Sequence, residues 1–237
     1  MQEGEGEEVL IFLDLETTGL ELEDKVCSIG MITLEDGEEN SLYELVNEGK
    51  KIPSKASSIH HITNEMIREK PKLVDTQAYK LLCENNLEST VIAGHNVNFD
   101  MQKLKAVGFE YKGSLIDTLR VSRHLIPECE SYALSFLRYE LKLYKNELRT
   151  LTPHHALDDA FVLKSLFEYL LEIATQEKMC ELSFKNVLIE KFGFGKYAGR
   201  YIEEIALYER GYLEWMLAQV DLDEDLAYSL NYYLQTT

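Results

Sequence analysis

The chain has 237 residues, 45% of them hydrophobic, and its 24 basic and 42 acidic residues give a formal net charge of −18. This length allows one sizeable domain and a small additional unit. The negative charge argues against a protein that holds nucleic acid by its overall charge. It does not exclude a local basic groove, or an acidic site that metal ions bridge to phosphates. No stretch reaches the roughly 18 apolar residues of a membrane span.

The N-terminal region and the cysteines predict a cellular compartment. The first ten residues are acidic and lack the basic and then apolar layout of a secretory signal. The cysteines are scattered, without a CxxC pair or a zinc-binding spacing, at Cys27, Cys83, Cys129 and Cys180. We therefore expect a reduced, cytoplasmic protein that does not associate with membranes, and the sequence indicates no particular protein partner.

The first third of the chain predicts strands and then short helices. The apolar run VLIFLDLETTG at 9–19 predicts a buried strand, and residues 27–46 predict a hairpin that turns at EDGEEN. Residues 54–71 predict a loop that leads into a short helix with Thr63 as its N-cap, and residues 75–86 predict a helix.

The next part alternates between strands and helices. We expect a buried strand, a helix that ends at Gly108, a short strand or helix start, an amphipathic helix and a long helix. Their ranges are 90–96, 98–109, 114–126, 131–144 and 153–178. This order predicts one α/β domain with a mixed sheet, the main domain, at residues 1–177.

Residues 183–237, the C-terminal module, have a different composition. A stretch rich in Gly and aromatic residues, KFGFGKYAGRYIEEI, turns helical and precedes two further short helices. Trp215, Tyr212 and Leu213 are expected to form the core of this module. Because about 55 residues are few for an independent fold, we expect the module to pack on the main domain.

Two carboxylates lie inside the first predicted strand. Side chains alternate along a strand, so Asp14 and Glu16 project from the same face. Like charges in a partly apolar setting repel and resist ionisation, and a hard cation such as Mg²⁺ or Mn²⁺ suits oxygen ligands. The alternative is a pair of acids at the solvent-exposed end of a strand.

Three further side chains are candidates for the same site. Asp100 lies where a strand gives way to a helix, and Asp159 lies early in the long helix, five residues after His154. Functional groups of open α/β sheets gather at strand ends and helix starts. Singly, Asp100 could be an N-cap and Asp159 a first-turn acid beside the helix dipole, so the combination carries the prediction.

The segments DLETTG, GHNVNFD and HHALDDA resemble, in order and spacing, three motifs of the DEDDh-type 3′–5′ exonucleases of the DnaQ-like proofreading superfamily. The resemblance covers residues 9 to about 172. It implies a ribonuclease-H-like α/β fold with a five-stranded mixed sheet flanked by helices. To this fold the sequence adds a small C-terminal module of a hairpin and helices.

The same resemblance implies the roles of the site residues. Two divalent ions, Mg²⁺ or Mn²⁺, would be held by Asp14, Glu16, Asp100 and Asp159. His154 would be the general base of a two-metal hydrolysis that releases nucleoside 5′-monophosphates from 3′ ends. His155 and Asp158 fall at positions that vary in the family.

Other positions match family residues that contact the terminal nucleotide. They are Thr17, Thr18, Gly19, Leu20, His60, Asn96 and Phe99. An ordinary strand-ending turn and a structural asparagine are the alternatives for Gly19 and Asn96. The segment around His60 resembles the family's His-Gly-Ile-Thr, with His61 in place of glycine. If the family's loop needs a backbone conformation that only glycine adopts easily, the loop of this chain must differ from it at His61.

The C-terminal module resembles the one that follows the exonuclease domain in exodeoxyribonuclease X-type proteins, through GKYAGR, IEEIA and GYLEWM. Basic residues interleave with aromatic ones here, which suits contact with phosphates and bases, so Lys196 and Arg200 are candidate nucleic-acid contacts. A small aromatic core with incidental lysines is the alternative.

Together these features predict a metal-dependent 3′–5′ exodeoxyribonuclease that acts on single-stranded DNA or frayed 3′ ends. A 3′–5′ exoribonuclease with the same site is the first alternative, because no residue visibly reads the 2′-OH. A non-catalytic nucleic-acid-binding subunit is the second, and the complete set of four acids and one histidine disfavours it.

Overall fold

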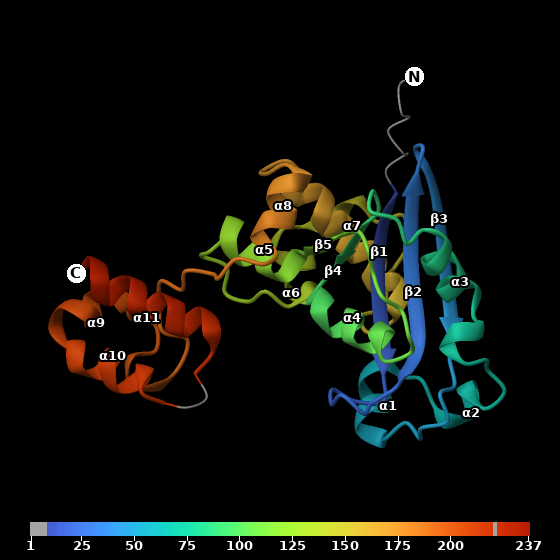
Figure 1. Cartoon of the computed structure of the whole chain (residues 1–237), viewed down its shortest axis with the longest axis horizontal. Coiled ribbons are helices and arrows are strands. Elements are labelled where there is room, and N and C mark those ends of the chain that lie inside the picture. Colours follow the sequence, from blue (N-terminus) through green and yellow to red (C-terminus); the bar gives the residue numbers. More distant parts are fainter. Residues whose placement is uncertain (1–8, 220–221) are drawn as a thin grey trace.

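A computed structural model describes residues 9–219 and 222–237 (Figure 1). One five-stranded sheet forms the centre of the main domain, in the order β3-β2-β1-β4-β5. The strands are β1 (Leu10–Thr17), β2 (Val26–Glu35), β3 (Glu38–Leu45), β4 (Val91–Gly94) and β5 (Ser114–Asp117). β1, β2 and β3 pair antiparallel, whereas β4 runs parallel to both β1 and β5. The predicted five-stranded mixed sheet is confirmed.

Helices cover both faces of this sheet. They are α1 (Ser54–His60), α2 (Asn64–Ile67), α3 (Gln77–Glu84), α4 (Val97–Lys105), α5 (Thr118–Leu125), α6 (Leu134–Glu140), α7 (Ala156–Leu171) and α8 (Gln176–Leu182), with 3₁₀ turns at Leu73–Asp75 and Leu143–Asn146. Within the described part of the chain, no helix is long and apolar enough to cross a membrane.

The alternation of side chains along β1 divides the core in two. Leu13 faces a cluster that includes Leu82 of α3 and Leu104 of α4. Phe12 faces the opposite cluster, where its ring meets that of Phe167 on α7 edge-on, with 5.2 Å between ring centroids. The sheet is therefore sandwiched between α3 and α4 on one side and α5 to α8 on the other.

The long helix predicted over 153–178 is two helices. α7 ends at Leu171, and Thr175 caps the separate helix α8 through a hydrogen bond from the amide of Lys178. Met179 and Leu182 of α8 belong to the same core cluster as Phe167. The expected boundary at residue 177 thus lies inside a helix that packs on the main domain.

The C-terminal module holds α9 (Ile202–Tyr208), α10 (Arg210–Leu217) and α11 (Glu224–Thr236), after a 3₁₀ turn at Gly195–Tyr197. A bridge between Lys191 and Tyr201 closes the hairpin. Leu213 is fully buried, as predicted, but Trp215 is 57% exposed, so its assignment to the core was wrong. Leu213 and Met216 face the core from α10, and this spacing turns Trp215 outward.

A buried ion pair fastens the C-terminal module to the main domain. Asp225 of α11 is 3% exposed and accepts hydrogen bonds from the guanidinium of Arg120 on α5, at 3.0 and 3.2 Å. The same carboxylate accepts from the backbone amide of Val187 at 2.9 Å. The module thus touches the main domain through polar contacts, but its apolar core, formed by residues between Leu188 and Leu234, contains no residue of that domain. Figure 1 accordingly shows its helices as a lobe of their own.

Candidate active site

The carboxyl end of β1 carries the two acids that the sequence singled out. Asp14 and Glu16 are half-buried and alternate with the buried Leu13 and Leu15. Asp14 lies opposite Gly30 of β2 in the antiparallel register. Both acids therefore project from the face of the sheet that α7 covers, as the spacing predicted.

Gly30 lets α7 approach this face closely. A Cβ atom at Gly30 would lie 2.2 Å from the carbonyl carbon of Ala156 and 2.2 Å from the amide nitrogen of Leu157. Only a residue without a side chain allows the first turn of α7 to rest on β2 at this point. That contact places Asp159, which also lies in the first turn, beside Asp14 and Glu16.

Asp100 reaches the site from the other side of the sheet. It lies in the first turn of α4, is 4% exposed, and accepts a hydrogen bond from the backbone amide of Leu15 at 3.1 Å. This bond ties the acid of α4 to the strand that carries Asp14 and Glu16. Asp100 is therefore not the N-cap of its helix; Asn96 holds that position.

His154 lies in the loop before α7. Its backbone adopts φ of +60°, a left-handed conformation that is unfavourable for histidine, and its amide donates a hydrogen bond of 2.9 Å to Asp159 Oδ2. Glu16, His154 and Asp159 offer ligand atoms that all lie within 4.8 Å of one another. The structure thus brings together residues that the sequence separates by more than 130 positions.

Two residues beside His154 and Asp159 hold this loop. Asp158 is buried, pairs with Arg149 and accepts a hydrogen bond from the amide of Thr152 at 2.8 Å. His155 caps α7, and its ring stacks on that of Tyr43 with 4.2 Å between centroids. These contacts hold the loop that carries His154, and neither residue belongs to the group of candidate metal ligands.

The four acids of the cluster resist ionisation. Burial is the largest cause in each case, and it raises the pKa of Glu16 to about 7 and that of Asp159 to about 6. Burial, together with the neighbouring carboxylates, raises the pKa of Asp14 well above its usual range, and burial likewise raises that of Asp100. A divalent cation relieves this repulsion, so the oxygen-rich cluster fits a divalent-metal site.

Asp117 is a residue that the sequence reasoning missed. It ends β5, is 2% exposed, caps α5 and accepts a hydrogen bond from the backbone amide of Asn96 at 3.0 Å. Asn96 in turn begins α4 with φ of +71°. The available signal was an aspartate directly before the helical run TLRVSRHL, a typical N-cap position.

The loop after Glu16 holds the first group of predicted substrate contacts. Thr17 and Thr18 are buried; Thr18 donates a hydrogen bond of 2.9 Å to Asp24. A Cβ at Gly19 would lie 2.4 Å from Asp24 Oδ2, so the glycine makes room for that carboxylate. Leu20 is 83% exposed, which leaves its side chain free to meet a ligand.

The second group is divided between the surface and the interior. Asn96 is exposed and Phe99 half-buried, with the ammonium of Lys103 5.1 Å from the centre of its ring. His60, in contrast, is 6% exposed, and its Nε2 lies 3.7 Å from the thiol of Cys27. Burial lowers the pKa of His60, so this ring is held inside the fold as a neutral group.

The loop after His60 does not differ in the way that the sequence suggested. His61 adopts φ of +62° and ψ of 7°, the left-handed conformation that glycine favours at a helix C-terminus. The inference that a non-glycine residue must change this loop was therefore wrong. The hydrogen bond from the amide of His61 to Ser57 O, 2.9 Å long, holds the conformation in place.

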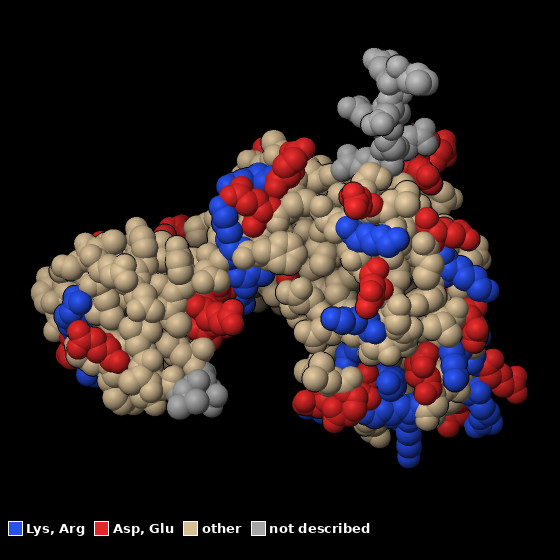
Figure 2. All heavy atoms as spheres, viewed as in Figure 1, with Lys and Arg blue, Asp and Glu red and all other residues tan. Residues whose placement is uncertain are grey.

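The candidate nucleic-acid contacts of the C-terminal module are both exposed. The ammonium of Lys196 lies 4.6 Å from the centre of the Tyr197 ring. Arg200 forms an ion pair with Glu204 one helical turn further on, with N–O distances of 3.0 and 2.5 Å. Figure 2 shows few charged side chains on the visible face of this module.

Comparison with known proteins identifies the class of enzyme. The model of the family described as Exonuclease matches residues 11–167, a range that contains all five residues of the acid and histidine cluster. A second model, described as Exodeoxyribonuclease X-like C-terminal, matches residues 192–221. Since the first match covers more than half of the 237 residues, the chain belongs to the Exonuclease family.

Individual relatives agree with this assignment. The chain is 28% identical to Exodeoxyribonuclease 10 of Escherichia coli (strain K12), over 97% of this chain and 100% of that protein. It is 30% identical to the PolC-type DNA polymerase III of Thermotoga maritima over 75% of this chain, but only 13% of that protein. The solved structure "Exonuclease X in complex with 5′ overhanging duplex DNA" matches with a TM-score of 0.60 and 27% identity, over 73% of this chain and 99% of that one. The resemblance to 3′–5′ exonucleases and the ribonuclease-H-like fold are thereby confirmed.

Proposed function

We propose that this chain is a 3′–5′ exodeoxyribonuclease that releases nucleoside 5′-monophosphates from 3′ ends. The observation that carries the proposal is the convergence of Glu16, His154 and Asp159 within 4.8 Å, beside Asp14 and Asp100. These residues come from β1, α4, α7 and the loop before α7. In our proposal the main domain, which includes all of α8, carries the chemistry, and the C-terminal module contacts nucleic acid through Lys196 and Arg200.

The four carboxylates are proposed to hold two divalent cations, Mg²⁺ or Mn²⁺. Bound there, the cations supply charge that activates a water and offsets the charge of the scissile phosphate. The protein contributes fixed positions: β1 presents Asp14 and Glu16, the amide of Leu15 holds Asp100, and α7 presents Asp159. Glu16, His154 and Asp159 already offer ligand atoms within 4.8 Å of one another.

His154 is proposed as the general base. Histidine can accept and give up a proton near neutral pH, and this one is exposed, so its proton can pass on to solvent. The hydrogen bond from its amide to Asp159 fixes its backbone relative to the metal ligands. A water held between Glu16 and Asp159 would thus lie within reach of the imidazole.

DNA is proposed as the substrate because of two relatives. Exodeoxyribonuclease 10 aligns with this chain over its whole length, and the exonuclease X structure contains DNA. The exposed Leu20 and Asn96, with Phe99 beside them, are proposed to meet the terminal nucleotide. We propose single-stranded DNA or frayed 3′ ends, where an unstacked terminal base offers its face to the exposed Leu20.

A nuclease assay tests the proposal. The protein is incubated with 5′-labelled and, separately, 3′-labelled single-stranded DNA in Mg²⁺ or Mn²⁺, with an EDTA control. We expect a ladder that shortens from the 3′ end, is lost in EDTA and is lost in His154→Ala. His124→Ala is the matched control, because this histidine lies on α5, outside the cluster, and it should keep most of the activity.

Other outcomes separate the alternatives. Cleavage of the matching RNA but not of DNA would replace the proposal with an exoribonuclease. Full activity of the double variant Asp14→Ala, Glu16→Ala would overturn the assignment of the metal ligands. Inactivity on both nucleic acids, with binding intact, would instead favour a non-catalytic binding subunit.

A further inference from the structure

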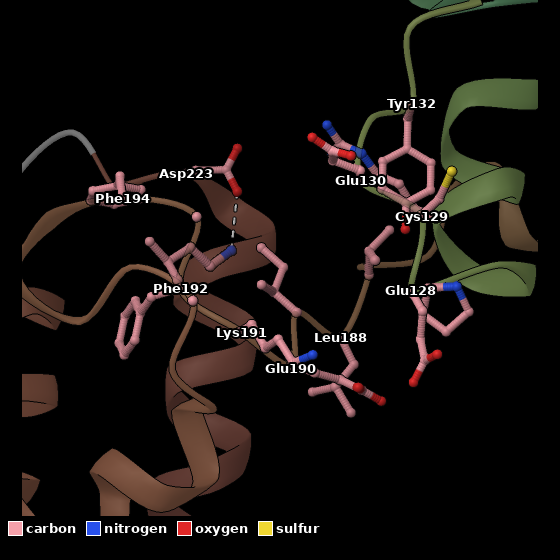
Figure 3. A pocket seen from close by; sticks show the side chains of 17 residues that line it. Glu128, Cys129, Glu130, Tyr132, Leu188, Glu190, Lys191, Phe192, Phe194 and Asp223 are labelled. Atoms are coloured by element: carbon pink, nitrogen blue, oxygen red, sulfur yellow. Dashed lines mark hydrogen bonds between the residues drawn. The ribbon is translucent and has the colours of Figure 1, made fainter. Parts of the chain in front are cut away.

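A second cavity lies away from the acid and histidine cluster, where the C-terminal module meets the main domain. Its volume is about 680 Å³, within the range of ligand-binding pockets. Figure 3 shows the loop that carries Glu128, Glu130 and Tyr132 on one side and the segment from Leu188 to Phe194 on the other. None of the proposed metal ligands lines it. A ligand in this cavity would contact both parts of the protein.

The interior of the cavity is apolar. Val187, Phe192 and Leu226 line it and are each at most 5% exposed. Phe194 also lines it but is 57% exposed. Phe194 thus extends the apolar surface of the cavity into solvent, where a ligand that enters the cavity could bury it.

The rim of the cavity is acidic. Glu128 and Glu130 come from the loop between α5 and α6, and Glu190 and Asp223 come from the C-terminal module. Within the described part of the chain, none of these four carboxylates forms an ion pair with a basic side chain. Asp223 also caps α11 by accepting a hydrogen bond of 3.0 Å from the amide of Leu226, as Figure 3 shows, and this bond leaves its negative charge in place. The charges of all four carboxylates are therefore available to a cationic ligand.

The two basic side chains of the cavity do not cancel this charge. The guanidinium of Arg123 lies 3.7 Å from Asp225 and 5.8 Å from the centre of the Tyr132 ring. The ammonium of Lys191 lies 4.5 Å from the centre of the Tyr201 ring. Lys191 interacts electrostatically with Glu128 and Glu190 and offsets part of their charge. Four acids against this one lysine still leave an excess of negative charge, which repels the phosphates of a nucleic acid and attracts lysine or arginine.

We propose that this cavity, the junction pocket, binds a segment of a partner protein in which leucine or phenylalanine side chains alternate with lysine or arginine. The apolar side chains would enter the cavity beside Phe194, and the basic ones would pair with the carboxylates of Glu128, Glu130, Glu190 and Asp223. The site is separate from the nuclease chemistry, so a partner bound there would leave the acid and histidine cluster accessible.

Peptide binding tests this proposal on the full-length protein. Short fluorescein-labelled peptides that alternate leucine with lysine are titrated and followed by fluorescence anisotropy. A matched set carries glutamate in place of lysine. We expect saturable binding of the basic set that weakens as salt rises, and binding of the acidic set at least about tenfold weaker.

Variants locate the binding. Glu128→Lys with Glu130→Lys should weaken the basic peptide by about tenfold or more, and Phe194→Ser should weaken it to a similar extent. The matched control, Glu84→Lys with Glu88→Lys, makes the same change of charge on and after α3 and should leave affinity unchanged. Circular dichroism checks that each variant is folded.

Three results would overturn the proposal. The first is a failure to locate binding at the pocket: either the basic peptides do not bind saturably, or the control variant loses as much affinity for them as the pocket variants do. The second is binding of a labelled single-stranded oligonucleotide, with no peptide present, that Phe194→Ser weakens as much as it weakens the peptide, which would make the pocket a nucleic-acid site. The third is dimerisation of the wild-type protein that Phe194→Ser abolishes, which would make a second copy of this chain the occupant.

Discussion

The carboxylate of Asp117 accepts a hydrogen bond from the backbone amide of Asn96 across 3.0 Å. The same oxygen accepts from the amide of Leu119, also at 3.0 Å, as the N-cap of α5. One buried acid thus joins the end of β5 to the N-cap residue of α4. Because Asp100 lies in the first turn of α4, Asp117 is a positioning residue for a proposed metal ligand.

Loss of this acid should impair the site without removing a ligand. In Asp117→Ala the partly buried amide of Asn96 loses its partner and α5 loses its cap, which together destabilise the fold by about 2 kcal/mol. We expect kcat to fall about tenfold or more while KM for DNA changes little. Steady-state kinetics and urea unfolding measure the two effects.

The conservative variant distinguishes positioning from general damage. Asp117→Asn keeps an oxygen that can accept from the amide of Asn96, so it should restore most of the activity lost in Asp117→Ala. The apparent affinity for Mn²⁺, measured by calorimetry, should follow the same order. Equal activity of the alanine variant and wild type would refute the positioning role.

Gly30 should tolerate no side chain. Its Cβ would overlap the backbone of α7 at Ala156 and Leu157, at 2.2 Å from each, so α7 must move away from the sheet. We expect Gly30→Ala to destabilise the protein by at least about 1–3 kcal/mol and to weaken Mn²⁺ binding, because Asp159 moves with the helix. Gly211→Ala, where a Cβ meets nothing within 4 Å, is the control. It should unfold at or above the wild-type urea concentration, because Gly211 lies in α10 and alanine favours a helix over glycine. An unchanged unfolding midpoint in Gly30→Ala would contradict the close approach.

The carboxylates of the metal-free site should destabilise the fold as pH rises. Burial and the charge of Asp159 raise the pKa of Glu16 from 4.5 to about 7. The folded state therefore keeps a proton that the unfolded state has already released. The contribution of Glu16 to the free energy of unfolding is fully present below pH 4.5 and is lost as pH rises to about 7.

A difference measurement isolates this contribution. Burial lowers the pKa of His95 from 6.5 to about 4, so this histidine removes stability as pH falls and opposes the trend. Unfolding in EDTA at pH 5 and pH 8 is therefore compared between wild type and Glu16→Gln. Between pH 5 and pH 8, the free energy of unfolding of the wild type should fall by on the order of 2 kcal/mol more than that of the variant. Mn²⁺ at about 100 times its Kd should return about 2.7 kcal/mol to the wild type at pH 8. Parallel pH profiles of the two proteins in EDTA would contradict the raised pKa.

The sequence predicted the acids of the site because their spacing obeys local rules. Asp14 and Glu16 are two residues apart on a strand, and Asp159 and His154 flank the start of one helix. These relations depend on strand and helix periodicity, which a sequence displays directly. The hairpin of β2 and β3 and the N-cap Thr63 were predictable for the same reason, and both are confirmed.

Contacts between distant segments were not predictable in this way. Gly30 is required by the backbone of α7, more than 120 residues later, and nothing near Gly30 in the sequence indicates that contact. The outward direction of Trp215 depends on which face of α10 meets α9 and α11, and composition alone suggested the core. His61 likewise holds a glycine-like conformation that single-residue preferences disfavour.

The C-terminal module offers the last test, which concerns Lys196 and Arg200. If both contact phosphates, Lys196→Glu with Arg200→Glu should weaken binding of single-stranded DNA several-fold at moderate salt while the metal-dependent chemistry survives. The slope of log K against log salt should also fall by about 1.4, since each contact with a single strand contributes about 0.7. Anisotropy titrations at several salt concentrations in Ca²⁺ or EDTA measure both quantities.

A control variant and a change at the ion pair of Arg200 show whether a change in DNA affinity comes from these two residues. Lys70→Glu with Lys72→Glu reverses the same number of exposed charges on the main domain and should leave the slope closer to that of wild type. Because Glu204 already pairs with Arg200, Glu204→Gln should free the guanidinium and strengthen DNA binding. Two results together would contradict the proposed contact: unchanged DNA affinity in the Lys196 and Arg200 variant, and no gain in affinity in Glu204→Gln. Both residues would then serve only the structure of the hairpin. The proposed contacts with the 3′ strand would be limited to Leu20, Asn96 and Phe99.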